Sequence, residues 1–123
     1  MVFFFFYHHL MHTDNLNKLH EQYTIEQGYV MVQSYDEDTH RLCLCKKKGD
    51  PTKLYGRMVE FKQITLQEII TKLNDIEEIR LGHTNLYTLD TIQAYTLEEH
   101  SQTCYIIYNE LCTNGVPTTP LRL

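Results

Sequence analysis

The amino-acid sequence predicts an α+β fold: a single domain with a mainly antiparallel sheet of five to six strands and two helices, in the order β-α-βββ-α-ββ. Three observations support this prediction. The 123 residues suffice for one domain with its own core. Alternating apolar residues mark several strands, and a capped apolar stripe marks a helix between them. The apolar and charged fractions, 42% and 22%, are typical of a folded protein.

The N-terminal segment Val2–Tyr7 is a run of apolar and aromatic β-formers. We expect it to be either a buried first strand or a segment that a second subunit covers. It is too short to span a membrane and lacks the flanks of a signal peptide. Apolar residues from Leu16 to Tyr23 then recur at helical spacing, which predicts a helix at about 14–27 that ends at Gly28.

Three strands are predicted next. Residues 29–35 and 41–47 read as two strands of a hairpin, and a turn with Gly49 and Pro51 separates them from a third strand at 54–64. Thr65-Leu-Gln-Glu68 is a capping box, so a helix begins there. Its apolar stripe consists of Leu66, Ile69, Ile70 and Leu73.

The C-terminal third predicts two strands and a tail. Residues 86–97 alternate in hydrophobicity and pair with 104–111 through the polar segment 98–102. We expect the domain to span residues 1–112 and to be followed by a mobile tail at 113–123, which contains two prolines and little that could pack.

Charge is distributed unevenly along the chain. The net charge is −5, but residues 41–62 carry seven basic and two acidic residues, a local charge of +5. This basic block suggests a nucleic-acid contact as an alternative function. Its candidate contact residues are Lys46, Lys47, Lys48, Lys53 and Arg57. The interpretation without a function is a solvated strand edge, where lysines discourage aggregation.

Glu60 and Lys62 lie two residues apart on the predicted third strand and therefore share one of its faces. The order of helix, three strands, helix and strand, with this Glu-x-Lys pair, resembles the core of the PD-(D/E)xK nuclease family. The resemblance implies a Mg²⁺-dependent nuclease in which Asp50 or Asp38 completes the metal site with Glu60. The alternative interpretation is a solvated strand face on which the two residues pair.

A second alternative is structural zinc. Cys43, Cys45, His100 and Cys104 are soft ligands that two adjacent strands could bring together. The Cys-x-Cys spacing does not match a zinc knuckle, and cysteines on strands are more often small core residues. Four irregularly spaced cysteines do not make a disulfide scaffold either, so we expect reduced thiols and a cytoplasmic protein.

No nucleophile motif, phosphate-binding glycine loop or dinucleotide fingerprint is present in the sequence. The sequence therefore favours a small, non-catalytic binding or regulatory protein of the kind that viruses and mobile elements carry as inhibitors, without a cofactor. Its expected partner is a protein, and the aromatic N-terminus suggests a homodimer. Nine tyrosines and no tryptophan supply amphipathic rings for such a contact. The candidate contact residues are Tyr29, Tyr35, Tyr55, Tyr87, Tyr95 and Tyr108.

Overall fold

The computed structural model describes residues 1–7, 11–32, 34–36, 41–43, 52–75 and 88–108; for residues 34–36, 41–43 and 88 it describes the backbone alone. The elements are β1 (Val2–Phe6), α1 (Thr13–Leu19), β2 (Tyr23–Val32), β3 (Ser34–Asp36), β4 (Arg41–Cys43), β5 (Thr52–Phe61), α2 (Leu66–Asp75), β6 (Thr88–Thr96) and β7 (Ser101–Tyr108).

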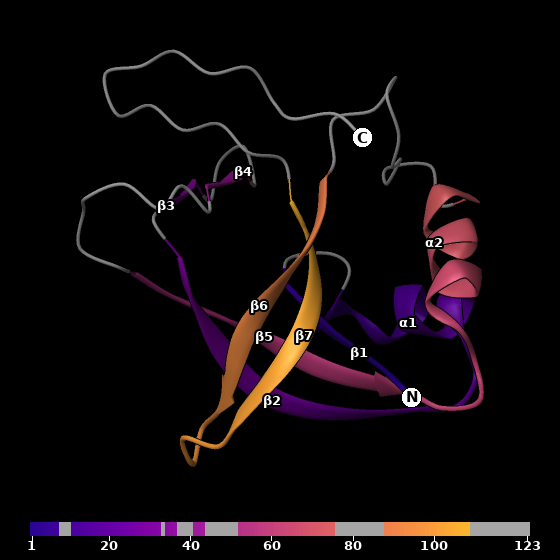
Figure 1. Ribbon diagram of the computed structural model, residues 1–123, viewed down its shortest axis with the longest axis horizontal. Helices are drawn as coiled ribbons and strands as arrows, with labels where there is room; N and C mark the ends of the chain where they lie inside the picture. The colour runs from indigo at the N-terminus through magenta and orange to yellow at the C-terminus, as the bar shows by residue number, and fades with distance from the viewer. Residues whose placement is uncertain (8–10, 33, 37–40, 44–51, 76–87, 109–123) are drawn as a thin grey trace.

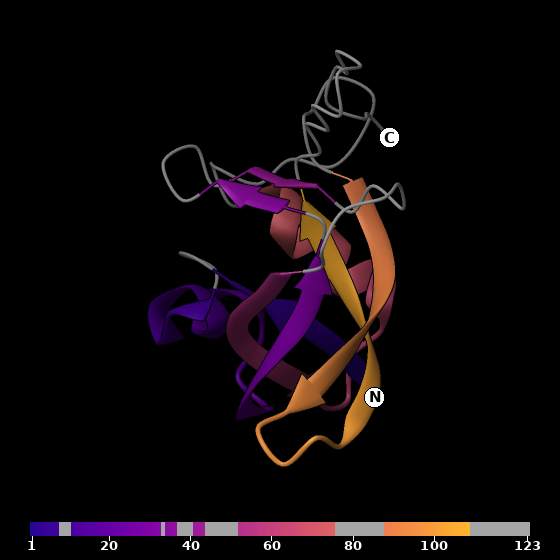
Figure 2. The same ribbon diagram turned by 90° about the vertical axis from the view of Figure 1, so that its left-hand side faces the viewer.

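Five strands close into a barrel in the order β1-β5-β2-β6-β7, and β3 and β4 form a separate two-stranded sheet (Figures 1 and 2). Neighbouring strands are antiparallel except β1 and β7, which are parallel where they close the barrel. The two helices contact each other at one side of the barrel. The prediction of a single α+β domain with a mainly antiparallel sheet and two helices is confirmed.

The side chains of the barrel form two cores because successive strand residues point to opposite faces. The inner core fills the barrel and includes Phe5, Val30, Met58 and Ile106. The outer core lies between the barrel wall and the helices. Its buried members are Val2, Phe4, Phe6, Leu16, Leu19, Val59, Phe61, Ile64, Ile69, Leu73 and Ile107.

The aromatic N-terminal run is therefore a buried first strand, as one of the two interpretations expected. Phe4, Phe5 and Phe6 are at most 1% exposed within a single chain. Phe4 and Phe6 stack with their ring centroids 5.1 Å apart, and Phe61 meets both edge-on. No second subunit is needed to cover these rings, so a homodimer no longer follows from them.

Two glycines lie opposite each other near the middle of the ladder between the two longest strands, β2 and β5. Gly28 of β2 faces Gly56 of β5 in the ladder. A Cβ atom on Gly28 would collide with the Tyr95 carbonyl oxygen, and one on Gly56 would collide with that of Phe6 and lie 2.8 Å from the Phe5 ring. Because glycine lacks this atom, the backbones of β6 and β1 can approach β2 and β5 closely.

Helix α2 begins as the sequence predicts. The Thr65 backbone N–H donates to the Glu68 carboxylate at 3.3 Å, and the Glu68 N–H donates to the Thr65 hydroxyl oxygen at 3.2 Å. These reciprocal bonds satisfy two donors at the start of the helix, as a capping box does. Ile69 and Leu73 of the predicted stripe are fully buried. No helix in the described ranges has the length and hydropathy needed to cross a membrane.

The predicted helix at 14–27 is wrong in its second half. Helix α1 ends at Leu19, and β2 begins at Tyr23. Residues 23–32 pair with β5 over their whole length, which satisfies more backbone groups than a short, uncovered helix would. Gly28 consequently lies inside a strand and does not end a helix.

The three strands expected between the helices do not form one sheet. Of the predicted strand at 41–47 the structure describes Arg41–Cys43, which pairs with β3, while β5 pairs directly with β2 and β1. The last two strands form the expected hairpin, with Thr88 opposite Tyr108. The proposed tail at 113–123 lies outside the described residues.

The glycine pair yields a stability prediction. Gly56→Ala should lower the free energy of unfolding by about 1–3 kcal/mol, the usual cost of overpacking a core, because the new methyl group meets the β1 backbone. Urea unfolding followed by circular dichroism measures this change. The control is Gln27→Ala at an exposed position of β2, which should change the stability by about 0.5 kcal/mol or less. Equal stability of the two variants would contradict the role given to Gly56.

Candidate functional site: an acidic pocket at the barrel mouth

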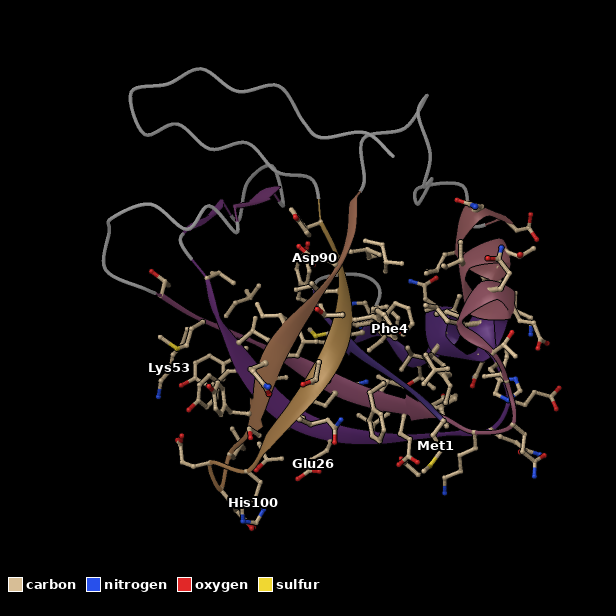
Figure 3. The ribbon with its side chains drawn as sticks, viewed as in Figure 1. Met1, Phe4, Glu26, Lys53, Asp90 and His100 are labelled. Carbon is tan, nitrogen blue, oxygen red and sulfur yellow. The ribbon has the colours of Figure 1, made fainter. Side chains whose placement is uncertain are left out.

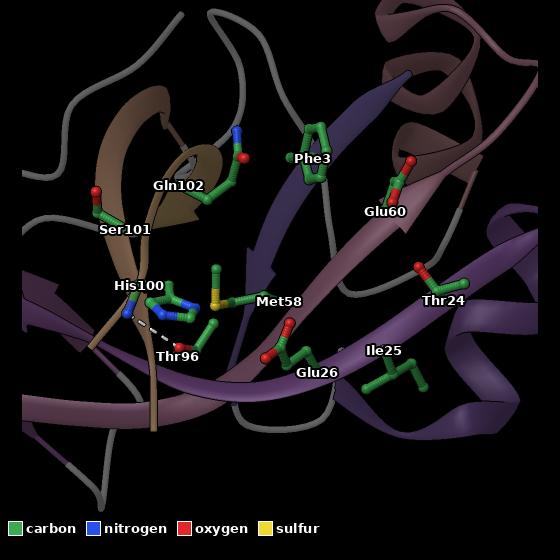
Figure 4. A pocket seen from close by; sticks show the side chains of 10 residues that line it. All are labelled: Phe3, Thr24, Ile25, Glu26, Met58, Glu60, Thr96, His100, Ser101 and Gln102. Carbon is green, nitrogen blue, oxygen red and sulfur yellow. Dashed lines mark hydrogen bonds between the residues drawn. The ribbon is translucent and has the colours of Figure 1, made fainter. Parts of the chain in front are cut away.

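A pocket of about 390 Å³ opens at the end of the barrel next to the β6–β7 turn (Figures 3 and 4). We call it the mouth pocket. Its lining residues come from β1, β2, β5, the end of β6, the turn and the start of β7. They are Phe3, Thr24, Ile25, Glu26, Met58, Glu60, Thr96, His100, Ser101 and Gln102.

The strand register sets the floor of this pocket. Glu60 lies opposite Phe3 on one side and Thr24 on the other, so these three residues form one row across β1, β5 and β2. Met58 and Glu26 belong to the next row. Because both rows face the barrel interior, they place two carboxylates beside an aromatic ring and a thioether.

Neither carboxylate has a partner among the described residues. Glu60 is half-buried and Glu26 is exposed, and the described part of the chain offers them no ion pair or hydrogen bond. Figure 4 shows both side chains rising from the same side of the sheet, whereas Ile25 points away from it. Within the described residues, the mouth pocket therefore carries two negative charges without a paired cation.

The wall opposite the carboxylates is the tight turn from Thr96 to His100. The Thr96 N–H donates to the His100 carbonyl oxygen at 2.8 Å, and the His100 N–H donates to the Thr96 hydroxyl at 3.1 Å. Glu99 adopts a left-handed backbone conformation with φ of 70°. Its side chain accepts a hydrogen bond from the Tyr29 hydroxyl at 2.5 Å, which fixes the turn against β2. That hydrogen bond raises the pKa of Tyr29 to about 12.

This combination of groups suits a compact ligand with a positive charge. The carboxylates accept hydrogen bonds from an ammonium group, and Thr96 and Gln102 can bind a neighbouring polar group. Phe3 and Met58 offer contact to an apolar portion. A volume of about 390 Å³ is at the lower end of the range for small-molecule sites, about 300–1,000 Å³.

The structure describes two of the four residues of the nuclease hypothesis, Glu60 and Lys62. Glu60 lines the mouth pocket, while Lys62 follows the end of β5 and is exposed. Asp38 and Asp50 lie outside the described residues. Among the described strands, β3 and β4 pair with each other, and β5 pairs with β2 and β1. No group of three or more metal-binding side chains occurs within the described ranges.

The structure describes the side chains of two of the four residues in the zinc hypothesis, His100 and Cys104. His100 is exposed at the turn, whereas Cys104 is 1% exposed in the inner core. Burial raises the pKa of the Cys104 thiol to about 12, which disfavours the thiolate that zinc requires. The side chain of Cys43 is not described, and Cys45 lies outside the described residues.

Three of the predicted contact tyrosines form a stack on the outer face of the barrel. The Tyr29 ring lies 5.4 Å from that of Tyr95 and 5.8 Å from that of Tyr55, measured between centroids. The Lys53 ammonium lies 4.5 Å from the Tyr29 ring centroid. Tyr55 is 59% exposed, and Met31 belongs to the same face. We call these five residues the tyrosine surface.

The other three predicted contact tyrosines do not belong to the tyrosine surface as described. Tyr108 is 4% exposed in the inner core and offers no surface for a partner. The side chain of Tyr35 is not described, and Tyr87 lies outside the described residues.

The predicted nucleic-acid block is only partly described. Lys53 stands over Tyr29, and Arg57 donates from its guanidinium to the Met11 carbonyl oxygen at 2.7 Å. Arg57 therefore ties β5 to the segment before α1. Lys46, Lys47 and Lys48 lie outside the described residues.

The sequence points to Glu60 as a nuclease residue and to His100 as a zinc ligand, but it does not predict that they share a pocket with Glu26, Thr96 and Gln102. The predicted helix at 14–27 contains Glu26, whereas in the structure this residue lies on β2. The alternation Thr24-Ile-Glu26 could have indicated a strand, but nothing local to it reveals the register with β5.

Comparisons with known proteins add a fold likeness. No family model matches the sequence, and no curated protein matches it significantly. Among solved structures, the chain is similar to one described as a gamma-glutamyl cyclotransferase, with a TM-score of 0.52 and 13% sequence identity. The match covers 87% of this chain and 65% of that chain, so this chain spans less than two thirds of that structure. At this identity the likeness concerns the fold alone.

Proposed function

We propose that this protein binds a small amine-bearing molecule in the mouth pocket. The observation that carries the proposal is the pair of unpartnered carboxylates, Glu26 and Glu60, which face one cavity of about 390 Å³. A primary ammonium group is compact and donates three hydrogen bonds, so it can meet both carboxylates. The hydroxyl of Thr96 and the amide of Gln102 supply donors and acceptors for the rest of the ligand.

The fold likeness suggests which amines to test first. A γ-glutamyl group, the group in the name of the similar structure, carries an α-ammonium and an amide within one short chain. In this proposal the ammonium lies between the two carboxylates, and the amide lies toward the turn. Phe3 and Met58 contact the methylene groups. The proposal concerns binding, and it uses only residues that line the pocket.

Titration calorimetry with a γ-glutamyl dipeptide tests this function. The dipeptide should bind, and its N-acetylated form, which lacks the ammonium charge, should bind at least about 10-fold more weakly. Glu26→Gln and Glu60→Gln should each weaken the binding of the dipeptide by about 10-fold, since a charged hydrogen bond contributes about 1.5–3 kcal/mol.

The matched control is Glu21→Gln, which removes an exposed carboxylate that does not line the pocket and should leave the affinity unchanged. Equal affinity for the dipeptide and its acetylated form would refute the proposal. The same samples report on catalysis. Cyclisation joins the α-amino nitrogen to the γ-carbonyl carbon and breaks the amide bond, so a lactam and a new free amine appear together.

The tyrosine surface favours a second candidate function, in which the protein acts without catalysis through protein contact. The tyrosine surface lies outside the core that packs against the helices. On this surface Tyr55 is 59% exposed and Tyr95 is half-buried, whereas Tyr29, whose ring contacts both, is 6% exposed. Amphipathic rings of this kind are enriched at protein interfaces. Lys53 and Glu99 lie on either side of Tyr29, and a two-fold axis can pair such opposite charges. The partner that fits this pattern is a second copy of the chain.

Sedimentation equilibrium tests the second candidate. The protein should form dimers, and Tyr55→Ser should raise the dissociation constant at least about 10-fold, because it removes the most exposed ring of the surface. The control is Leu97→Ser, since Leu97 lies in the β6–β7 turn and is equally exposed, at 58%. A monomer at all concentrations, or an equal loss in both variants, would argue against the tyrosine surface as a dimer interface.

A further inference from the structure

The first half of β2 has an open edge beside the mouth pocket. β2 pairs with β5 from Tyr23 to Val32, but it pairs with β6 only from Gly28 to Val30. On the β6 side, residues 23–26 therefore have no neighbouring segment among the described elements. Residues 24–27 are all exposed.

The hydrogen bonds next to this edge show which backbone groups are free. The Lys62 N–H donates to the Gln22 carbonyl oxygen at 3.0 Å, so Gln22 directs its backbone groups toward β5. In an antiparallel ladder this direction alternates from residue to residue. Ile25 therefore directs its N–H and C=O groups to the open side, where no described residue bonds to them, whereas Leu97 of the β6–β7 turn lies opposite Gln27.

The side chains along this edge alternate between two environments. Glu26 points into the mouth pocket, and Ile25 points to the outer face, where it is 38% exposed. A strand added along the edge would place one side chain beside Glu26 and the next beside Ile25. The edge thus offers main-chain hydrogen bonds, an acidic subsite and an apolar subsite in register.

The charge of the pocket selects the occupant. Glu26 and Glu60 line the pocket and Glu98 lies in the adjoining turn, whereas the lining residues include no Lys or Arg. A basic side chain is the complement to this set. Exposed strand edges commonly bind extended peptides, with backbone bonds providing affinity and side-chain pockets providing specificity.

We infer that the amine recognised by the mouth pocket is carried on an extended peptide, which adds to β2 as an antiparallel strand and places a lysine beside Glu26 and Glu60. This inference rests on the proposed function, because the lysine ammonium occupies the same subsite as the amine proposed above. The residue that follows the lysine forms backbone hydrogen bonds with Ile25.

The test uses an acetylated and amidated peptide, Lys-Thr-Val, and two forms with one N-methylated backbone nitrogen. Methylation of the threonine nitrogen, which lies opposite Ile25, removes a bond to β2 and should weaken binding at least about 10-fold. Methylation of the lysine nitrogen, which faces away from β2, should change the affinity by less than about 2-fold. At saturation, hydrogen exchange of the Ile25 amide should slow by at least about 10-fold.

The outcomes separate this inference from the proposed function. Equal effects of the two methylations, or unchanged exchange at Ile25, would overturn strand addition. Binding of the γ-glutamyl dipeptide that still depends on Glu26 would then leave the proposed function standing. If neither the peptide nor the dipeptide binds, both proposals fail. Because the chemical change is made in the peptide, no result depends on the folding of a variant.

Discussion

The close approach of four strands at Gly28 and Gly56 is the constraint on which the rest of this structure depends. β2 and β5 are each ten residues long and pair over their full length. A long flat ribbon could not bring β1 and β6 together through β7. Because Gly28 and Gly56 lack a Cβ atom, the backbones of β6 and β1 can come close to β2 and β5. The sheet can therefore curve and close into a barrel with an interior. The inner core exists only because of this closure.

The closed barrel has two ends that differ in how well they are covered. At one end the outer face of the barrel is covered by α1 and α2, whose buried leucine and isoleucine side chains pack on Val59 and Phe61. Near the β6–β7 turn, β6 leaves β2 after Gly28 and the wall opens. Polar and acidic side chains occupy this end because water reaches it. The mouth pocket and the open edge of β2 thus have a common origin in the short β2–β6 ladder.

The elements that the sequence predicted well are those with local causes. The capping box at Thr65 and Glu68 and the hairpin of β6 and β7 depend on residues close together in the chain. The start of β2 depends on distant residues instead. Tyr23 continues the helical spacing of Leu16, but its ring packs on Phe61 and its hydroxyl donates to Asn17 across the end of α1. Tertiary pairing overrides the local pattern at this point.

The candidate site was less predictable than the fold, for a related reason. Glu26 and Glu60 are 34 positions apart, and their approach is a property of the β2–β5 register. A shift of one residue in that ladder would turn either side chain to the outer face and dissolve the acidic pocket. The register itself is fixed by the glycine pair, since any other pairing would set a Cβ atom against the β1 or β6 backbone. The chemistry at the mouth therefore depends on two residues that take no part in it.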